Sequence, residues 1–333
     1  MSSTFKAAVV QAAPVLFDTP RTLAKLAELA REAAQKGANL VVFPEAFVGG
    51  YPKGLDFGAR LGMRSPEGRE AFRRYFESAI DLAGPEAQRL GEIARDHHIH
   101  LVVGIIERDG GTLYCTAVTY APSGKLILKH RKLMPTALER LVWGFGDGST
   151  IGVAETSLGR IGSVICWENY MPLLRTAMYA QGIELYCAPT VDDREAWFPT
   201  MRTIALEGRC FVISACQYMT RADGPADYAP IQGDDPQTVI IRGGSCIIDP
   251  LGNVLAEPDY SGETIKVAEI DRRIIARGKY DLDVVGHYAR PDIFRLSVDT
   301  KPKSAVVFSP IPAALSDMTP NDQHAPEAMP RSD

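Results

Sequence analysis

The sequence predicts an α/β fold with mixed sheets, and three observations predict it. Eight apolar runs lack strict polar–apolar alternation, which is typical of strands covered on both faces. Segments with helical periodicity lie between them, so strand and helix alternate along the chain. Tight-turn signals flanked by strand-like segments predict hairpins, and therefore antiparallel pairs beside parallel ones. At 333 residues and 46% apolar composition, the chain is long enough to bury a large core.

The predicted elements follow in chain order. Leu23, Leu26 and Leu29 share one face of the first predicted helix, and Pro172 begins the third, where its missing N–H is no loss. The strands are expected at residues 7–11, 40–43, 101–106, 164–166, 185–188, 211–215, 239–241 and 245–248. The helices are expected at residues 22–35, 85–97, 172–181 and 197–207, and the turns at residues 122–124, 158–160 and 249–253.

Composition also predicts the domain organisation. Residues 1–309 contain no linker and should form a single domain. Residues 310–333 turn to Pro, Ser, Asp and Met without periodicity, which predicts a C-terminal tail that is disordered or makes subunit contacts.

Charge and cysteine usage exclude several classes of protein. Lys and Arg total 36 against 41 Asp and Glu, giving a net charge of −5 with the basic residues dispersed, which argues against a nucleic acid partner. The sequence contains no run of about 18 apolar residues, so it predicts no membrane-spanning helix. The apolar stretch at residues 7–10 is too short for the core of a signal peptide. Six cysteines without a Cys-x-x-Cys pair indicate reduced thiols in a cytoplasmic protein.

Three polar residues stand near the ends of predicted core strands, where α/β folds present catalytic groups. They are Glu45, Lys132 and Cys166. Each also has an ordinary interpretation: a capping carboxylate, a solvated end of the basic run 129–132, and a small apolar residue. Cys166 lies just ahead of a predicted helix. Both the helix N-terminus and a nearby ammonium would favour the thiolate form of this cysteine.

Three segments resemble the catalytic signatures of the nitrilase superfamily, in its order and spacing. They are residues 43–45 (Phe-Pro-Glu), 130–136 (His-Arg-Lys-Leu-Met-Pro-Thr) and 166–172 (Cys-Trp-Glu-Asn-Tyr-Met-Pro). The Cys-Trp-Glu form is similar to the true nitrilase branch more than to amidases. Residues 48–54 (Val-Gly-Gly-Tyr-Pro-Lys-Gly) resemble bacterial nitrilases acting on arylacetonitriles. Flanking matches extend the resemblance from about residue 5 to residue 300.

The resemblance implies an architecture. It is a four-layer α-β-β-α sandwich with mixed sheets, pairing into an eight-layer αββα-αββα dimer. Homo-oligomers of this kind often extend into spirals or helical filaments.

The resemblance also implies site residues. Glu45, Lys132 and Cys166 would be catalytic, and Glu139 would orient Lys132 and water, although a surface ion pair with Arg140 is the simpler alternative. Substrate-binding candidates are Tyr51, Trp143 and Trp167, since aromatic faces suit a flat substrate; core packing is the alternative for each.

The implied reaction is the hydrolysis of a small organic nitrile, aromatic or arylaliphatic, to a carboxylic acid and ammonia. A thiol nucleophile would form thioimidate and thioester intermediates, with no metal or organic cofactor required. An amidase, a carbamoylase or an amide-forming nitrile hydratase-like enzyme could use the same three residues. We expect His287 to be structural or to contact another subunit, and we expect no metal site at His97, His98 and His100.

Two more distant alternatives stay open. A non-catalytic assembly or binding protein on the same scaffold predicts ordinary thiol reactivity at Cys166, whereas an enzyme predicts rapid, selective alkylation. A papain-like hydrolase would need a Cys-Gly-Ser-Cys-Trp pattern, which is missing from the sequence.

Overall fold

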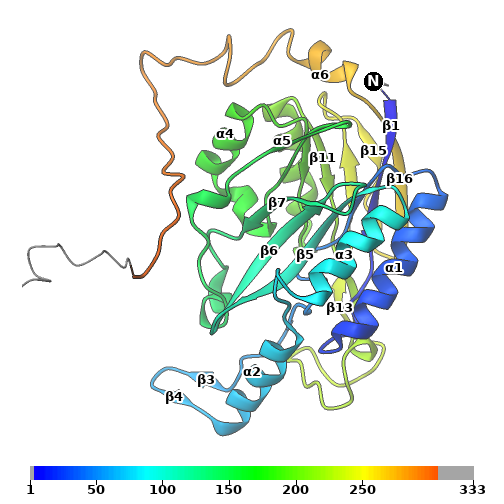
Figure 1. Cartoon of the computed structure of the whole chain (residues 1–333), viewed down its shortest axis with the longest axis vertical. Coiled ribbons are helices and arrows are strands. Elements are labelled where there is room, and N and C mark those ends of the chain that lie inside the picture. The colour runs from blue at the N-terminus through cyan, green and yellow to red at the C-terminus, as the bar shows by residue number, and fades with distance from the viewer. Residues whose placement is uncertain (1–3, 307–333) are drawn as a thin grey trace, which may run out of the picture. The chain divides into compact units, whose positions relative to one another are not determined.

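The computed structural model describes residues 4–306 (Figure 1). One compact unit ends at Lys301 and a second begins at Pro302, of which residues 302–306 are described. The predicted tail at residues 310–333 lies outside the described residues. Within the described part of the chain, no helix is both long and apolar enough to cross a membrane.

The first large sheet has six strands in the order β16-β1-β2-β5-β6-β7. Its centre, β1-β2-β5, is parallel, whereas β16, β6 and β7 pair antiparallel with their neighbours. The strands are β1 (Thr4–Gln11), β2 (Leu40–Val42), β5 (His100–Asp109), β6 (Thr112–Tyr120), β7 (Leu126–Arg131) and β16 (Thr264–Asp271).

The second large sheet has the order β15-β14-β11-β10-β9-β8. Again the centre, β9-β10-β11, is parallel and the flanking pairs are antiparallel. Its strands are β8 (Ala154–Thr156), β9 (Gly159–Ser163), β10 (Leu185–Cys187), β11 (Phe211–Ser214), β14 (Cys246–Ile248) and β15 (Val254–Ala256). Two short hairpins complete the strands: β3 (Ala59–Arg60) with β4 (Met63–Arg64), and β12 (Tyr218–Thr220) with β13 (Val239–Arg242).

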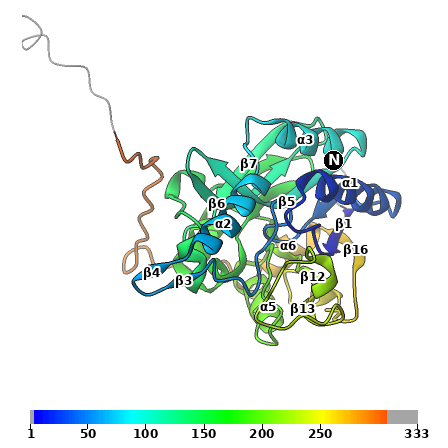
Figure 2. The same ribbon diagram turned by 90° about the horizontal axis from the view of Figure 1, so that it is seen from below.

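The helices pack on the sheets through apolar faces. The helices α1 and α3 share a buried cluster with the first sheet, and α4 and α5 share another with the second. A third cluster joins residues of both sheets, including Val42 and Ile213, and Figure 2 gives a second view of α1, α3 and α5. The helices are α1 (Thr19–Gln35), α2 (Pro66–Ser78), α3 (Pro85–Asp96), α4 (Pro172–Ala180), α5 (Trp197–Gly208) and α6 (Arg273–Gly278). The short 3₁₀ helices among residues 4–306 are η1 (Ala137–Leu141), η2 (Gly148–Thr150), η3 (Cys166–Tyr170) and η4 (Arg221–Asp223).

Most predicted elements are confirmed, including the four helices and the three hairpin turns. The strand predicted at residues 164–166 is wrong, because β9 ends at Ser163 and the chain then turns into η3. The helix α1 begins earlier than predicted because the Asp18 side chain accepts a hydrogen bond from the backbone N–H of Arg21 and caps it.

Candidate active site

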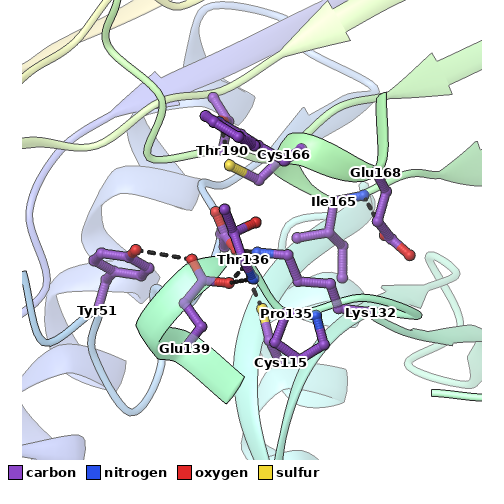
Figure 3. A network of polar contacts seen from close by, with 12 residues as sticks. Tyr51, Cys115, Lys132, Pro135, Thr136, Glu139, Ile165, Cys166, Glu168 and Thr190 are labelled. Carbon is purple, nitrogen blue, oxygen red and sulfur yellow. Dashed lines mark hydrogen bonds and ion pairs between the residues drawn. The ribbon is translucent and has the colours of Figure 1, made fainter. Parts of the chain in front are cut away.

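Glu45, Lys132 and Cys166 follow strands of both large sheets and come close together. Figure 3 shows Lys132 and Cys166 in this network. In the first sheet, Glu45 follows β2 and Lys132 directly follows β7. Cys166 follows β9 of the second sheet and is the first residue of η3. Strand ends thus deliver a carboxylate, an ammonium and a thiol to one place.

Lys132 is fully buried between two carboxylates. Its Nζ donates to Glu45 Oε1 at 2.7 Å and to Glu139 Oε2 at 2.8 Å, and lies 5.4 Å from the centroid of the Trp143 ring. Burial lowers the pKa of Lys132, but the Glu45 carboxylate and the other acidic groups around it raise the pKa well above its ordinary value. Lys132 therefore carries a fixed positive charge in the interior.

The two oxygens of Glu45 differ in their surroundings. Oε1 accepts from Lys132 and from the Cys115 thiol, whose Sγ lies at 3.4 Å. Oε2 is buried and has no hydrogen-bond partner among the described residues. Burial raises the pKa of the Glu45 carboxyl above its ordinary value of 4.5, and this effect exceeds the opposing effect of the Lys132 ammonium. Such a carboxylate is a stronger base than an exposed one, with Oε2 open to accept a proton.

The backbone at Glu45 is held by close packing. Its carbonyl oxygen accepts a hydrogen bond from Gln217 Nε2 at 2.8 Å, and the next residue, Ala46, has a φ of 50°. A Cβ at Gly104 of β5 would lie 2.5 Å from the Glu45 Cα, so only glycine permits this approach.

Cys166 sits on a strained turn, with a φ of 47°. Its backbone N–H donates to Pro189 O at 2.9 Å, and Asn169 Nδ2 donates to the Cys166 carbonyl at 2.7 Å. The Thr190 hydroxyl donates to Sγ at 3.2 Å. These contacts fix the direction of the thiol.

The protonation state of Cys166 differs from the expectation of a favoured thiolate. Burial raises the pKa of the thiol, and the Glu45 carboxylate raises it further, whereas Lys132 and the Thr190 hydroxyl lower it by less. The expected stabilisation by an ammonium exists, but burial outweighs it. Cys166 is therefore a neutral thiol at rest and needs a base to become a nucleophile.

Glu139 belongs to the same network and is not an ion-pair partner of Arg140. Its Oε2 accepts from Lys132 and from the backbone N–H of Thr136 at 2.6 Å, and its Oε1 accepts from the Tyr51 hydroxyl at 2.8 Å. The Arg140 side chain donates instead to Pro135 O at 3.0 Å. Glu139 is thus the second carboxylate, beside Glu45, that balances the charge of Lys132.

A cavity of about 670 Å³ opens over these groups, and Cys166 and Glu139 are part of its lining. Glu45 and Lys132 do not line the cavity and lie behind them. The three aromatic residues predicted to bind substrate, Tyr51, Trp143 and Trp167, also line the cavity.

The aromatic residues are held in different ways. Trp143 is buried and its Nε1 donates to the Tyr75 hydroxyl at 3.0 Å, so it serves the core as well as the cavity. Trp167 is 41% exposed; its Nε1 donates to Asp192 Oδ2 at 2.9 Å and the Arg194 guanidinium lies 4.5 Å from its ring centroid.

The histidines singled out in the sequence, His97, His98, His100 and His287, make no hydrogen bond or ion pair with this network among the described residues. Among residues 4–306, no group of three or more His, Cys, Asp or Glu side chains could hold a metal ion. His287 is exposed in the single chain. Sequence reasoning missed Cys115 and Thr190, which contact Glu45 and Cys166 and which no local motif marks.

Comparison with known proteins agrees with the sequence signatures. The carbon–nitrogen hydrolase family matches residues 6–280. An aliphatic nitrilase of Sinorhizobium fredii is 60% identical over 91% of this chain and 98% of its own length. The bifunctional nitrilase/nitrile hydratase NIT4A of Lupinus angustifolius is 53% identical over 95% of this chain and 92% of its own length.

Solved structures show the same fold at lower sequence identity. Nit3 of Saccharomyces cerevisiae, a member of branch 10 of the nitrilase superfamily, matches with a TM-score of 0.65 and 23% identity, covering 86% of this chain and 97% of Nit3. An amidase from Nesterenkonia sp. matches with a TM-score of 0.62 and 19% identity, covering 83% of this chain and 94% of the amidase. By the family match over most of its length and by its relatives at 60% and 53% identity, the chain belongs to the carbon–nitrogen hydrolase family and, within it, to the nitrilases.

Proposed function

We propose that the protein hydrolyses an organic nitrile to a carboxylic acid and ammonia, with Cys166 as nucleophile, Glu45 as general base and Lys132 as electrostatic stabiliser. The observation that carries the proposal is the asymmetry of Glu45. Its Oε1 is occupied by Lys132 and Cys115, while Oε2 is buried without a partner, and the Cys166 thiol is close enough to affect its pKa.

The first half of the reaction follows from this arrangement. Glu45 Oε2 takes the thiol proton as Sγ of Cys166 adds to the nitrile carbon, and the same proton passes to the nitrile nitrogen. The product is a covalent thioimidate with Glu45 ionised again. Because the thiol is neutral at rest, thiolate forms only as the S–C bond does.

Two water molecules complete the reaction. Glu45 removes a proton from the first as its oxygen adds to the thioimidate carbon, and passes that proton to nitrogen, which becomes an amine. The hydroxyl proton of this tetrahedral intermediate then passes through Glu45 to the amine as the C–N bond breaks, so ammonia leaves and a thioester remains. Glu45 activates the second water in the same way, the carboxylic acid departs, and the proton returns to Cys166 Sγ. The balance is one nitrile and two waters to one acid and one ammonia.

Lys132 and the start of η3 would stabilise negative charge as it develops. Lys132 is charged and cannot move away, since Glu45 and Glu139 hold its Nζ. The first N–H groups of a helix, here including Trp167, lack intrahelical acceptors and can donate to the substrate. Preorganised donors of this kind are typically worth about 3 kcal/mol each. Glu139, and Tyr51 through it, would position Lys132 and water.

The cavity lining supports an aromatic or arylaliphatic nitrile as substrate. Tyr51, Trp143 and Trp167 line the cavity together with Cys166, and a volume of about 670 Å³ accommodates a benzyl group. We expect ammonia release to be fastest from phenylacetonitrile or mandelonitrile in a panel with benzonitrile, an aliphatic dinitrile and cyanide. A preference for the dinitrile, in line with the name of the S. fredii relative, would contradict this substrate class but not the reaction.

Partial release of the amide is a second candidate activity. It is favoured by the name of the L. angustifolius relative, a bifunctional nitrilase/nitrile hydratase. The acid-to-amide ratio depends on whether the tetrahedral intermediate loses ammonia or the thiol. Product analysis of the same panel, with phenylacetamide offered separately, distinguishes a nitrilase from an amide-forming enzyme and from an amidase or carbamoylase.

We further propose that residues 1–309 form one domain with a four-layer α-β-β-α arrangement, and that the domain pairs into an eight-layer dimer able to extend into spirals or filaments. Exposed apolar side chains on α4, α5 and the segment that follows α6 support such contacts. They include Leu173, Leu206, Tyr280, Tyr288 and Phe294. Six free buried cysteines are in keeping with a cytoplasmic location. Sedimentation velocity should give a dimer or larger species at micromolar protein; a concentration-independent monomer would contradict the pairing.

A further inference from the structure

Glu168, the third residue of the Cys-Trp-Glu signature, is a buried carboxylate that the reaction does not use. It lies in η3 with 1% of its surface exposed and does not line the cavity. Its Oε1 accepts from the backbone N–H of Leu133 at 2.6 Å, and its Oε2 accepts from the backbone N–H of Ile165 at 2.9 Å (Figure 3). Leu133 directly follows Lys132 and Ile165 directly precedes Cys166, so one carboxylate joins the two turns that carry them.

His130 of the lysine signature holds this carboxylate in place. Its Nε2 lies 3.0 Å from Glu168 Oε2 and 3.2 Å from Oε1, and its Nδ1 lies 3.1 Å from Thr150 O. Both ring nitrogens therefore face acceptors, and both acceptors are satisfied only if each nitrogen carries a hydrogen. Burial lowers the pKa of His130, but the Glu168 carboxylate raises it by more, in agreement with an imidazolium. The charges of this buried pair compensate each other.

The neighbouring charges of β7 belong to a separate cluster. Lys129 and Arg131 lie on either side of His130, and both donate to Glu107 Oε1. The distance is 3.2 Å from Lys129 Nζ and 2.7 Å from Arg131 Nη2. Successive strand residues point to opposite faces, so Lys129 and Arg131 point away from the face on which His130 lies. Among the described residues, the titratable group that bonds to His130 is therefore Glu168. Glu107 is likewise a buried carboxylate, 3% exposed, but it contacts neither catalytic turn.

We propose that Glu168 and His130 form a positioning pair that sets the distance between the Lys132 ammonium and the Cys166 thiol. The proposal rests on the roles proposed for Lys132 and Cys166. The pair links the two signatures directly: His130 belongs to the segment that contains Lys132, and Glu168 belongs to the segment that contains Cys166. Loss of the pair shifts the two turns relative to each other but replaces no residue of the cavity lining.

The test is the steady-state kinetics of Glu168→Gln with phenylacetonitrile. A glutamine keeps the size but turns an acceptor oxygen into an NH₂ group, which faces Leu133 N–H or Ile165 N–H. We expect kcat to fall by about 100-fold, because a displacement of about 1 Å at a reacting group has this effect. KM should change by less than about 3-fold, since no lining residue is altered. His130→Gln should lower kcat in the same way, and the double variant should be no worse than Glu168→Gln, as expected for residues acting as a unit.

Glu107→Gln is the matched control, because it removes a buried carboxylate that bonds to Lys129 and Arg131 of β7, the strand that also carries His130. We expect it to lower Tm with kcat within about 3-fold of the unaltered protein. If Glu168→Gln is insoluble, His130→Gln carries the test alone. This variant keeps both Glu168 oxygens, which accept from the backbone N–H groups of Leu133 and Ile165. Unchanged kcat in a folded Glu168→Gln or His130→Gln protein would overturn the positioning role, as would additive losses in the double variant. A Cys166→Ala protein that still released ammonia would instead overturn the proposed function.

Discussion

Replacing Cys166 with alanine should abolish ammonia release from nitriles, lowering kcat/KM by at least about 10⁴-fold, as expected when an essential nucleophile is removed. No other cysteine can take over, because the remaining five are buried and none lines the cavity. The fold should survive. The deleted sulfur is small, and the turn is held by the backbone N–H of Cys166 and by Asn169, which the substitution leaves in place.

The matched control is Cys246→Ala, which removes a buried thiol from the core between the second sheet and its helices. It should lose about 1 kcal/mol of stability or somewhat more and keep its activity. Circular dichroism and Tm establish that both variants are folded. Ammonia release by a folded Cys166→Ala protein above about 1% of the unaltered rate would be incompatible with a thiol nucleophile.

Glu45→Gln should lower kcat by about 10²- to 10⁴-fold, the usual contribution of a general base. The amide has almost the same shape but cannot accept the thiol proton at Oε2. The pH profile gives an independent signature. Because burial raises the pKa of Glu45 above 4.5, the base is protonated at low pH, and the activity of the unaltered protein should rise with pH along a limb centred above 4.5.

That acidic limb should disappear from the residual activity of Glu45→Gln. Glu184→Gln provides the control: Glu184 is a mostly buried carboxylate ion-paired with Arg272 at 2.8 Å, remote from the cavity lining. It should keep both the rate and the limb. If Glu45→Gln retained the acidic limb at full height, another group would have to act as the base.

Much of the fold could be predicted from the sequence because its elements carry local signals. Apolar runs predicted β1, β2, β5, β10 and β11, and periodic leucines predicted α1, although not its start at the Asp18 cap. The strand β16 (Thr264–Asp271) was missed because it has no continuous apolar run. Only Ala268 and Ile270 are buried, and charged residues interrupt it, as is common in an edge strand. The helix α2 (Pro66–Ser78) was missed because it buries few residues and is dominated by charged ones.

The candidate site could be predicted only in part. Glu45, Lys132 and Cys166 were predicted from strand ends and signatures, and Glu139 from its flanking stretch. The contacts of Cys115 with Glu45 and of Thr190 with Cys166 depend on how β6 and the turn after β10 pack, which no local pattern specifies. The direction of the Cys166 pKa shift was also out of reach, because it depends on how completely the turn is buried.

The central claim is that nitrile turnover passes through a covalent bond to Cys166, and trapping that bond tests it most directly. The protein is mixed with phenylacetonitrile, quenched in acid during turnover and analysed by peptide-resolved mass spectrometry. We predict that the peptide containing Cys166 gains the mass of the whole nitrile, as a thioimidate, or an acyl group in place of the thiol hydrogen, as a thioester. Sustained ammonia release with Cys166 unmodified at every quench time, and with the same rate in Cys166→Ala, would contradict the account.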